Sequence, residues 1–191
     1  MSKDRLEAFS DGVLAIIITI MVLGLAVPHE PTINALLELW PTFVSYVLSF
    51  AYVGIYWNNH HHLFQVVHAV DGRVLWANLL LLFCLSLFPF GTAWMGETGF
   101  ASVPVAIYGV ILLAAALAYF VLVRVLIRAQ PPEARLAEAI GSDTKGKISP
   151  LIYAVGIPVA LVAPWISFVL YAVVALIWIV PDQRIERTIA R

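Results

Sequence analysis

The stretch "RLEAFSDGVLAIIITIMVLGL", residues 5–25, decides the fold, because it is apolar over the width of a lipid bilayer. It still carries a carboxylate near its start, Asp11, and a hydroxyl near its middle, Thr19. Polar and ionisable groups at membrane depth cost free energy and usually face other protein or water. The stretch therefore predicts a membrane-spanning helix whose polar side chains need partners.

The composition of the whole chain also indicates a lipid environment. Hydrophobic residues make up 62% of the 191 residues and charged residues 12%, with a mean hydropathy of +0.93. Soluble domains are roughly 45–50% apolar and about 25% charged. We predict an all-α integral membrane protein, and we see no sign of nucleic-acid binding.

Apolar runs of membrane length predict six spans in a single domain covering residues 1–191. As one helix, residues 148–180 would be about 50 Å long, well beyond a hydrocarbon core of about 30 Å, so we predict a tight turn at Pro164 and Trp165. The linker 128–147 is predicted to contain a short helix over 132–140. The predicted spans are 10–27, 40–63, 74–95, 103–127, 148–163 and 165–180.

Charge placement predicts the orientation. In the six-span arrangement all eleven Lys and Arg residues fall on the side of the N-terminus, while Glu30, Glu38 and Glu97 lie on the other side. Short loops rich in Lys and Arg stay in the cytoplasm. We therefore expect both termini to be cytoplasmic.

Several polar side chains share the depth of Arg5 near the cytoplasmic end. Together they can satisfy one another, so we predict a hydrogen-bond and ion-pair network that joins the first three spans. Alternatively, Ser10 or Asp11 only caps the first helix or favours its N-terminal dipole end. The residues at this depth are Asp11, Asn58, Asn59, His60, His61, His62 and Asn78.

These groups do not predict a metal site or an enzyme. Consecutive histidines on a helix point about 100° apart, so His60, His61 and His62 do not converge on one ion, and zinc pairs on helices prefer spacings of three or four. The serines have no nucleophile-and-base motif around them. We expect no catalytic residues, no resident metal and no cofactor.

One face of the first helix has a regular pattern. Ile16, Thr19, Ile20 and Leu23 fall at i, i+3, i+4 and i+7, and Gly12 extends this face towards the cytoplasm. Simple helix packing explains the pattern, with Thr19 bonded to a carbonyl one turn earlier. The alternative is that the face lines a pore, which requires several copies of the chain around an axis.

At these residues the chain resembles a known family, the endolysosomal potassium channel called transmembrane protein 175 and its prokaryotic relatives. Arg5-x-x-x-Phe9-Ser10-Asp11-Gly12 opens the first span, and Trp57-x-x-His60-His61-x-x-Phe64 ends the second. Asn78 opens the third span, and Pro89-Phe90 follows within it. The resemblance extends over the whole chain.

The resemblance implies a tetrameric channel, selective for potassium over sodium, with a pore lined by the first helix of each subunit and no backbone-carbonyl filter loop. Ile16 would form the narrowest ring, with further layers at Thr19 or Ile20 and at Leu23. The implied partners are other copies of the chain, membrane lipids and permeant K⁺, in a prokaryotic plasma membrane. Asn58, Asn59 and His62 match no family position and have no assigned role.

The resemblance also assigns a structural polar network that holds the first helix without touching the ion. Its members here are Arg5, Asp11, Trp57, His60 and Asn78, and we place Phe9 and Ser10 of the same signature with them.

Two other functions stay open. Asp11 and His60–His62 are titratable groups near the cytoplasmic end, and an unperturbed histidine titrates near neutrality, which suits a proton channel. A coupled transporter or a structural membrane protein is the third reading, although no repeat between the two halves supports a transporter.

Overall fold

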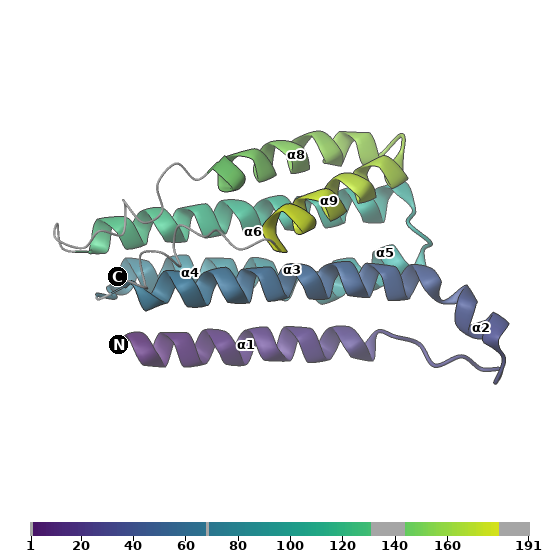
Figure 1. The fold of residues 1–191 in the computed structure, drawn as a ribbon, viewed down its shortest axis with the longest axis horizontal. Helices are drawn as coiled ribbons and strands as arrows, with labels where there is room; N and C mark the ends of the chain where they lie inside the picture. Colours follow the sequence, from purple (N-terminus) through teal and green to yellow (C-terminus); the bar gives the residue numbers. More distant parts are fainter. Residues whose placement is uncertain (1, 68, 131–143, 180–191) are drawn as a thin grey trace.

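The chain folds into a bundle of α-helices. The structure is a computed structural model that describes residues 2–67, 69–130 and 144–179, and no strand occurs within these ranges. Figure 1 shows the longer helices running side by side along the length of the molecule. The described helices are α1 (Lys3–Leu23), α2 (Ile33–Glu38), α3 (Trp40–Gln65), α4 (Gly72–Ser86), α5 (Phe88–Glu97), α6 (Ser102–Ala129), α8 (Thr144–Ala160) and α9 (Pro164–Ile179).

The first half of the chain differs from the predicted ranges in three places. Helix α1 ends at Leu23 rather than at 27, and Gly24 follows as its C-cap. The predicted outer loop contains the short helix α2, whose first turn is capped by the Thr32 side chain accepting from the Ala35 backbone N–H at 3.2 Å. The predicted span 74–95 is two helices, α4 and α5, that meet at Leu87, because Pro89 has no N–H for the helical ladder.

The second half contains the predicted hairpin. Helix α8 ends at Ala160, residues 161–163 form the turn, and Pro164 is already the first residue of α9. A proline suits that position because its missing N–H would be unpaired there in any case. The predicted connector helix, residues 132–140, lies outside the described residues.

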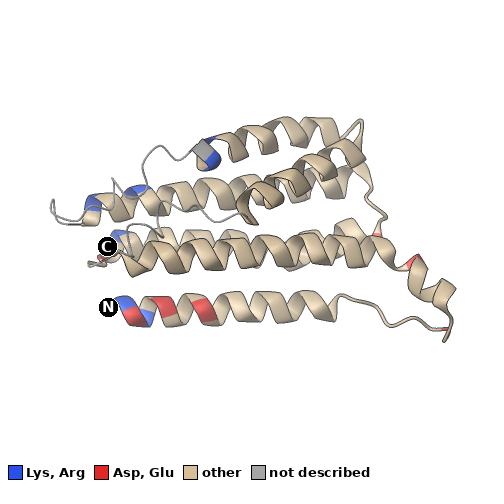
Figure 2. Ribbon diagram, viewed as in Figure 1, with Lys and Arg blue, Asp and Glu red and all other residues tan. Residues whose placement is uncertain are grey.

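Within the described residues, three helical stretches are both long and apolar enough to cross a membrane: Lys3–Leu23, Gly72–Glu97 and Ser102–Ala129. Helix α3 is 26 residues long but carries many polar side chains, and α8 and α9 have 17 and 16 residues. Figure 2 shows the described Lys and Arg residues gathered towards one end of the bundle, where α1 also carries acidic residues, whereas the opposite end shows acidic residues only. The protein is therefore a membrane protein with one basic end.

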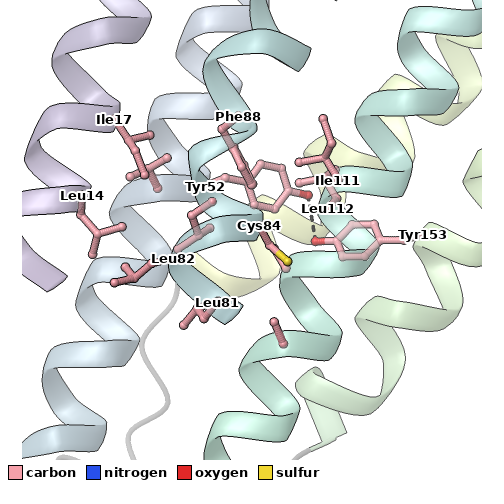
Figure 3. Close-up of a cluster of buried hydrophobic side chains, with 14 of the residues drawn as sticks. Leu14, Ile17, Tyr52, Leu81, Leu82, Cys84, Phe88, Ile111, Leu112 and Tyr153 are labelled. Atoms are coloured by element: carbon pink, nitrogen blue, oxygen red, sulfur yellow. Dashed lines mark hydrogen bonds between the residues drawn. The ribbon is translucent and has the colours of Figure 1, made fainter. Parts of the chain in front are cut away.

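Helix α1 lies at the edge of the bundle and packs on α3, α4 and α5. One face supplies the contact, with Leu6, Ser10, Leu14, Ile17 and Met21 buried. Figure 3 shows Leu14 and Ile17 pointing from α1 towards Leu82 and the core of the bundle. Because lipid is as apolar as leucine, close packing and hydrogen bonds must hold such a helix in place.

On the far side of the bundle, Tyr171 locks α9 against its neighbours. A Cβ on Gly109 of α6 would collide with the Tyr171 hydroxyl, and one on Gly156 of α8 would lie 2.6 Å from its ring. Glycine at these two positions therefore lets the α6 and α8 backbones approach the tyrosine closely.

We predict that Gly109→Ala lowers the free energy of unfolding by about 1–3 kcal/mol, because the added methyl group overpacks this contact. Gly54→Ala is the matched control, since a Cβ at Gly54 meets nothing within 4 Å. The unfolding midpoint in detergent measures both. An unchanged midpoint for Gly109→Ala would show that the tyrosine moves aside at no cost.

Candidate functional site: the two faces of helix α1

A buried chain of hydrogen bonds fastens the inner face of α1 to α4 and α3. The Asn78 Nδ2 donates to Ser10 Oγ at 2.9 Å, and the Ser10 hydroxyl donates to the Leu6 carbonyl, also at 2.9 Å. On its other side, Asn78 Oδ1 lies 2.9 Å from His60 Nε2. A carboxamide oxygen only accepts, so His60 carries its proton on Nε2 and donates.

This chain is almost completely shielded. Ser10 is 0% exposed, and His60 and Asn78 are 2% exposed. The His60 ring also stacks on Phe64, with ring centroids 4.4 Å apart. Buried polar groups without partners are costly in lipid, so the three side chains specify how α1 sits on α3 and α4.

A second link lies on the exposed side of the same region. The Trp57 indole N–H donates to Asp11 Oδ1 at 3.1 Å, joining α3 to α1. The Trp57 ring stacks on His61, with centroids 6.1 Å apart and an interplanar angle of 17°. Asp11 therefore has a partner on a neighbouring helix rather than serving only as a cap.

Not every predicted member of the polar network takes part in the hydrogen bonds that join α1 to α3 and α4. Within the described residues, Arg5 forms no ion pair, and Phe9 is 52% exposed. The Asn59 amide donates to Ile55 in its own helix, and His61 pairs with Gln65. Across the described part of the chain, no group of three or more His, Cys, Asp or Glu side chains could hold a metal.

The opposite face of α1 is open. Ile16, Ile20 and Leu23 are 58%, 48% and 81% exposed. At 100° per residue, Thr19 lies almost directly opposite the buried face, whereas Ile20 lies about 100° further round. Gly12 belongs to the same open face, and a Cβ there would meet nothing within 4 Å.

The Thr19 hydroxyl fits both interpretations, the bond to a carbonyl of its own helix and a position that lines a pore. It donates back to its own helix, with Ala15 and Ile16 carbonyls at 3.1 and 2.9 Å. Because this bond uses its only proton, the oxygen keeps lone pairs that face outward from an exposed position. The side chain is therefore satisfied within the helix and still offers an acceptor to anything that passes along this face.

Sequence reasoning missed a set of buried hydroxyls behind α1. Ser49 lies 2.8 Å from the Tyr108 hydroxyl and accepts from Thr92 at 2.6 Å. Tyr52 donates to the Tyr171 carbonyl at 2.6 Å and accepts from Tyr153 at 3.1 Å. The signal was present in α3, where Ser45, Ser49, Tyr52, Tyr56 and Asn59 follow one another at spacings of three and four.

Comparison with known proteins identifies the family. The family model of the endosomal/lysosomal potassium channel TMEM175 matches residues 5–89, which include both links to α1. A potassium channel of Chryseobacterium sp. is 53% identical over 189 residues, covering 99% of this chain and 98% of the relative. The chain belongs to the TMEM175 family.

More distant members of the TMEM175 family agree in sequence and in fold. The crystal structure of a lysosomal potassium-selective channel TMEM175 homolog from Chamaesiphon minutus matches with a TM-score of 0.79 and 32% identity, covering 92% of this chain and 95% of that one. The human endosomal/lysosomal proton channel TMEM175 is 34% identical over 116 residues, which is 54% of this chain and 23% of the human protein. These matches confirm the resemblance read from the sequence and support a channel function.

We predict that Asn78→Leu lowers the free energy of unfolding by about 1–3 kcal/mol, because it keeps the branched side-chain shape but leaves the buried His60 N–H without an acceptor. Asn58→Leu is the matched control, since Asn58 has no hydrogen bond to the described part of the chain. The unfolding midpoint in detergent is the measurement. Equal shifts for the two variants would contradict a special role for the buried chain.

Proposed function

We propose that this chain forms a homotetrameric potassium channel, selective for K⁺ over Na⁺, in a prokaryotic plasma membrane. Each subunit crosses the bilayer six times, through α1, α3, the α4–α5 pair, α6, α8 and α9, with both termini in the cytoplasm. The names of the Chryseobacterium and Chamaesiphon relatives support potassium as the ion. The basic end of the bundle supports the orientation, because Lys and Arg favour the cytoplasmic side.

The orientation of α1 is the observation that carries this proposal. Its inner face is held by Ser10 and Asn78, so its open face, with Ile16, Thr19 and Leu23, points away from the subunit's own helices. One helix cannot enclose a pore, whereas four copies around an axis can. We assign the narrowest ring to Ile16, with Thr19, Ile20 and Leu23 as further layers.

An apolar ring at Ile16 would work as a gate by excluding water. Hydrophobic constrictions close to ions when they dewet, because an ion cannot keep its hydration shell there. The Thr19 oxygens, one turn along, would offer acceptors to a partly dehydrated cation. In this account Asp11, Trp57, His60 and Asn78 position the helix and do not touch the ion.

We predict that Ile16→Asn raises potassium flux and weakens the preference for K⁺ over Na⁺, because a polar ring keeps the constriction wet. The assay is ion flux from liposomes that contain the purified protein, with a potential-sensitive dye. Val110→Asn is the control, since Val110 is similarly exposed but lies on α6 rather than on α1. Unchanged flux in Ile16→Asn would remove this residue from the constriction.

A proton channel is the second candidate. The vertebrate relatives are named endosomal/lysosomal proton channels, and here Asp11 is exposed near the start of α1 with Trp57 bound to one carboxylate oxygen. The two candidates differ in the permeant ion, so each requires its own measurement.

Proton flux predicts a reversal potential that follows an imposed pH gradient at symmetric potassium, and we expect Asp11→Asn to reduce that dependence. Glu7→Gln, on the same helix, is the control for loss of a negative charge. A reversal potential indifferent to pH would exclude substantial proton flux.

A further inference from the structure

A cleft lies in the half of the bundle remote from the open face of α1. Helices α3, α6, α8 and α9 form its walls, mainly with the aromatic side chains of Tyr52, Tyr56, Tyr119, Phe120, Tyr153 and Trp178. It is partly open to the surface, and its cavity volume is about 40 Å³. From Asn59 to Tyr52 it extends about 10 Å along α3.

The walls of the cleft suit an apolar occupant. The Trp178 N–H donates to Ser149 Oγ at 2.8 Å, and the Tyr153 hydroxyl donates to Tyr52 at 3.1 Å. These polar atoms already have protein partners, so the remaining lining is mostly ring and aliphatic carbon. Ligand pockets typically combine such apolar walls with a few polar groups at one end.

The rim of the cleft is basic. The Arg124 guanidinium lies over the Phe120 ring, 4.7 Å from its centroid, and the Lys145 ammonium lies 6.0 Å from the centroid of Trp178. Phe120 and Trp178 both line the cleft, so each cation stands beside its wall. Among the lining residues that the structure describes, none is Asp or Glu. Arg124 is exposed and lies in the last two turns of α6.

We propose that this cleft binds an anionic phospholipid from the leaflet at the basic end. One acyl chain lies between the aromatic walls, and the phosphate faces Arg124 and Lys145. Basic pockets between transmembrane helices bind anionic headgroups, and the charge on the rim selects them over zwitterionic ones. Because the cleft is separate from the α1 face, the site does not depend on which ion the protein conducts.

The test is native mass spectrometry of the purified full chain, delipidated and then titrated with phosphatidylglycerol or phosphatidylcholine of the same acyl chains. We expect tighter binding of phosphatidylglycerol. Arg124→Gln should weaken it by about fivefold, the effect of one basic residue near a membrane surface. Ala116→Phe should abolish it, because Ala116 lines the cleft and the ring fills the space.

Two matched variants control for charge and size. Arg128→Gln removes a basic residue from the same helix that lines no part of the cleft, and Leu117→Phe adds a ring at an exposed neighbour of Ala116. Neither should change binding. Arg124→Gln decides the outcome if Ala116→Phe fails to elute as the native oligomer.

Three results would overturn the proposal. Equal binding of the two lipids would remove the role of charge, and equal binding by all variants would place the lipid elsewhere. A parallel titration with oleate distinguishes a phospholipid from a free fatty acid as the bound anion. Oleate binding that Ala116→Phe abolishes, without competition from phosphatidylglycerol, would assign the cleft to a free fatty acid instead.

Discussion

One buried chain of hydrogen bonds, from His60 through Asn78 to Ser10, determines which face of α1 turns towards the bundle. In lipid, apolar faces gain little from one another, so a helix of leucines and isoleucines has few reasons to present one side rather than another. Three side chains that must satisfy each other remove that freedom. The outward direction of the open face of α1 follows from this constraint.

The same physical rule organises the rest of the bundle. Ser49, Tyr52 and their hydroxyl partners form a second buried polar set that fastens α3 to α5, α6, α8 and α9. Together with the close approach of Tyr171 to Gly109 and Gly156, these contacts make the helices behind α1 a fixed support. Helix α1 lies at the edge of that support and turns its open face outward.

Much of this was readable from the sequence, because membrane spans and helical faces depend on simple periodicities. The depth of Asp11, His60 and Asn78 followed from the rise of 1.5 Å per residue, and the shared face of Ile16, Thr19 and Leu23 followed from 3.6 residues per turn. The pairings did not follow, since depth alone does not say which neighbour a side chain meets. Arg5 shares the same depth and still forms no ion pair within the described residues.

Other features required three dimensions. Pro89 was visible in the sequence, but whether it bends a span or divides it into α4 and α5 depends on packing around Leu87. Helix α2 is only six residues long, which is too short for a periodic signal. The aromatic cleft draws its walls from four helices, and no single stretch of sequence contains its pattern.

The central claim is that the open face of α1 lines the path of the ion. Thr19→Cys, in a background where the buried Cys84 is replaced by alanine, tests it most directly with a water-soluble thiol reagent during potassium flux. We expect the reagent to modify this cysteine and stop the flux, whereas modification of the control Val121→Cys, exposed on α6, leaves the flux unchanged. Flux that continues after complete modification of Thr19→Cys would contradict the claim.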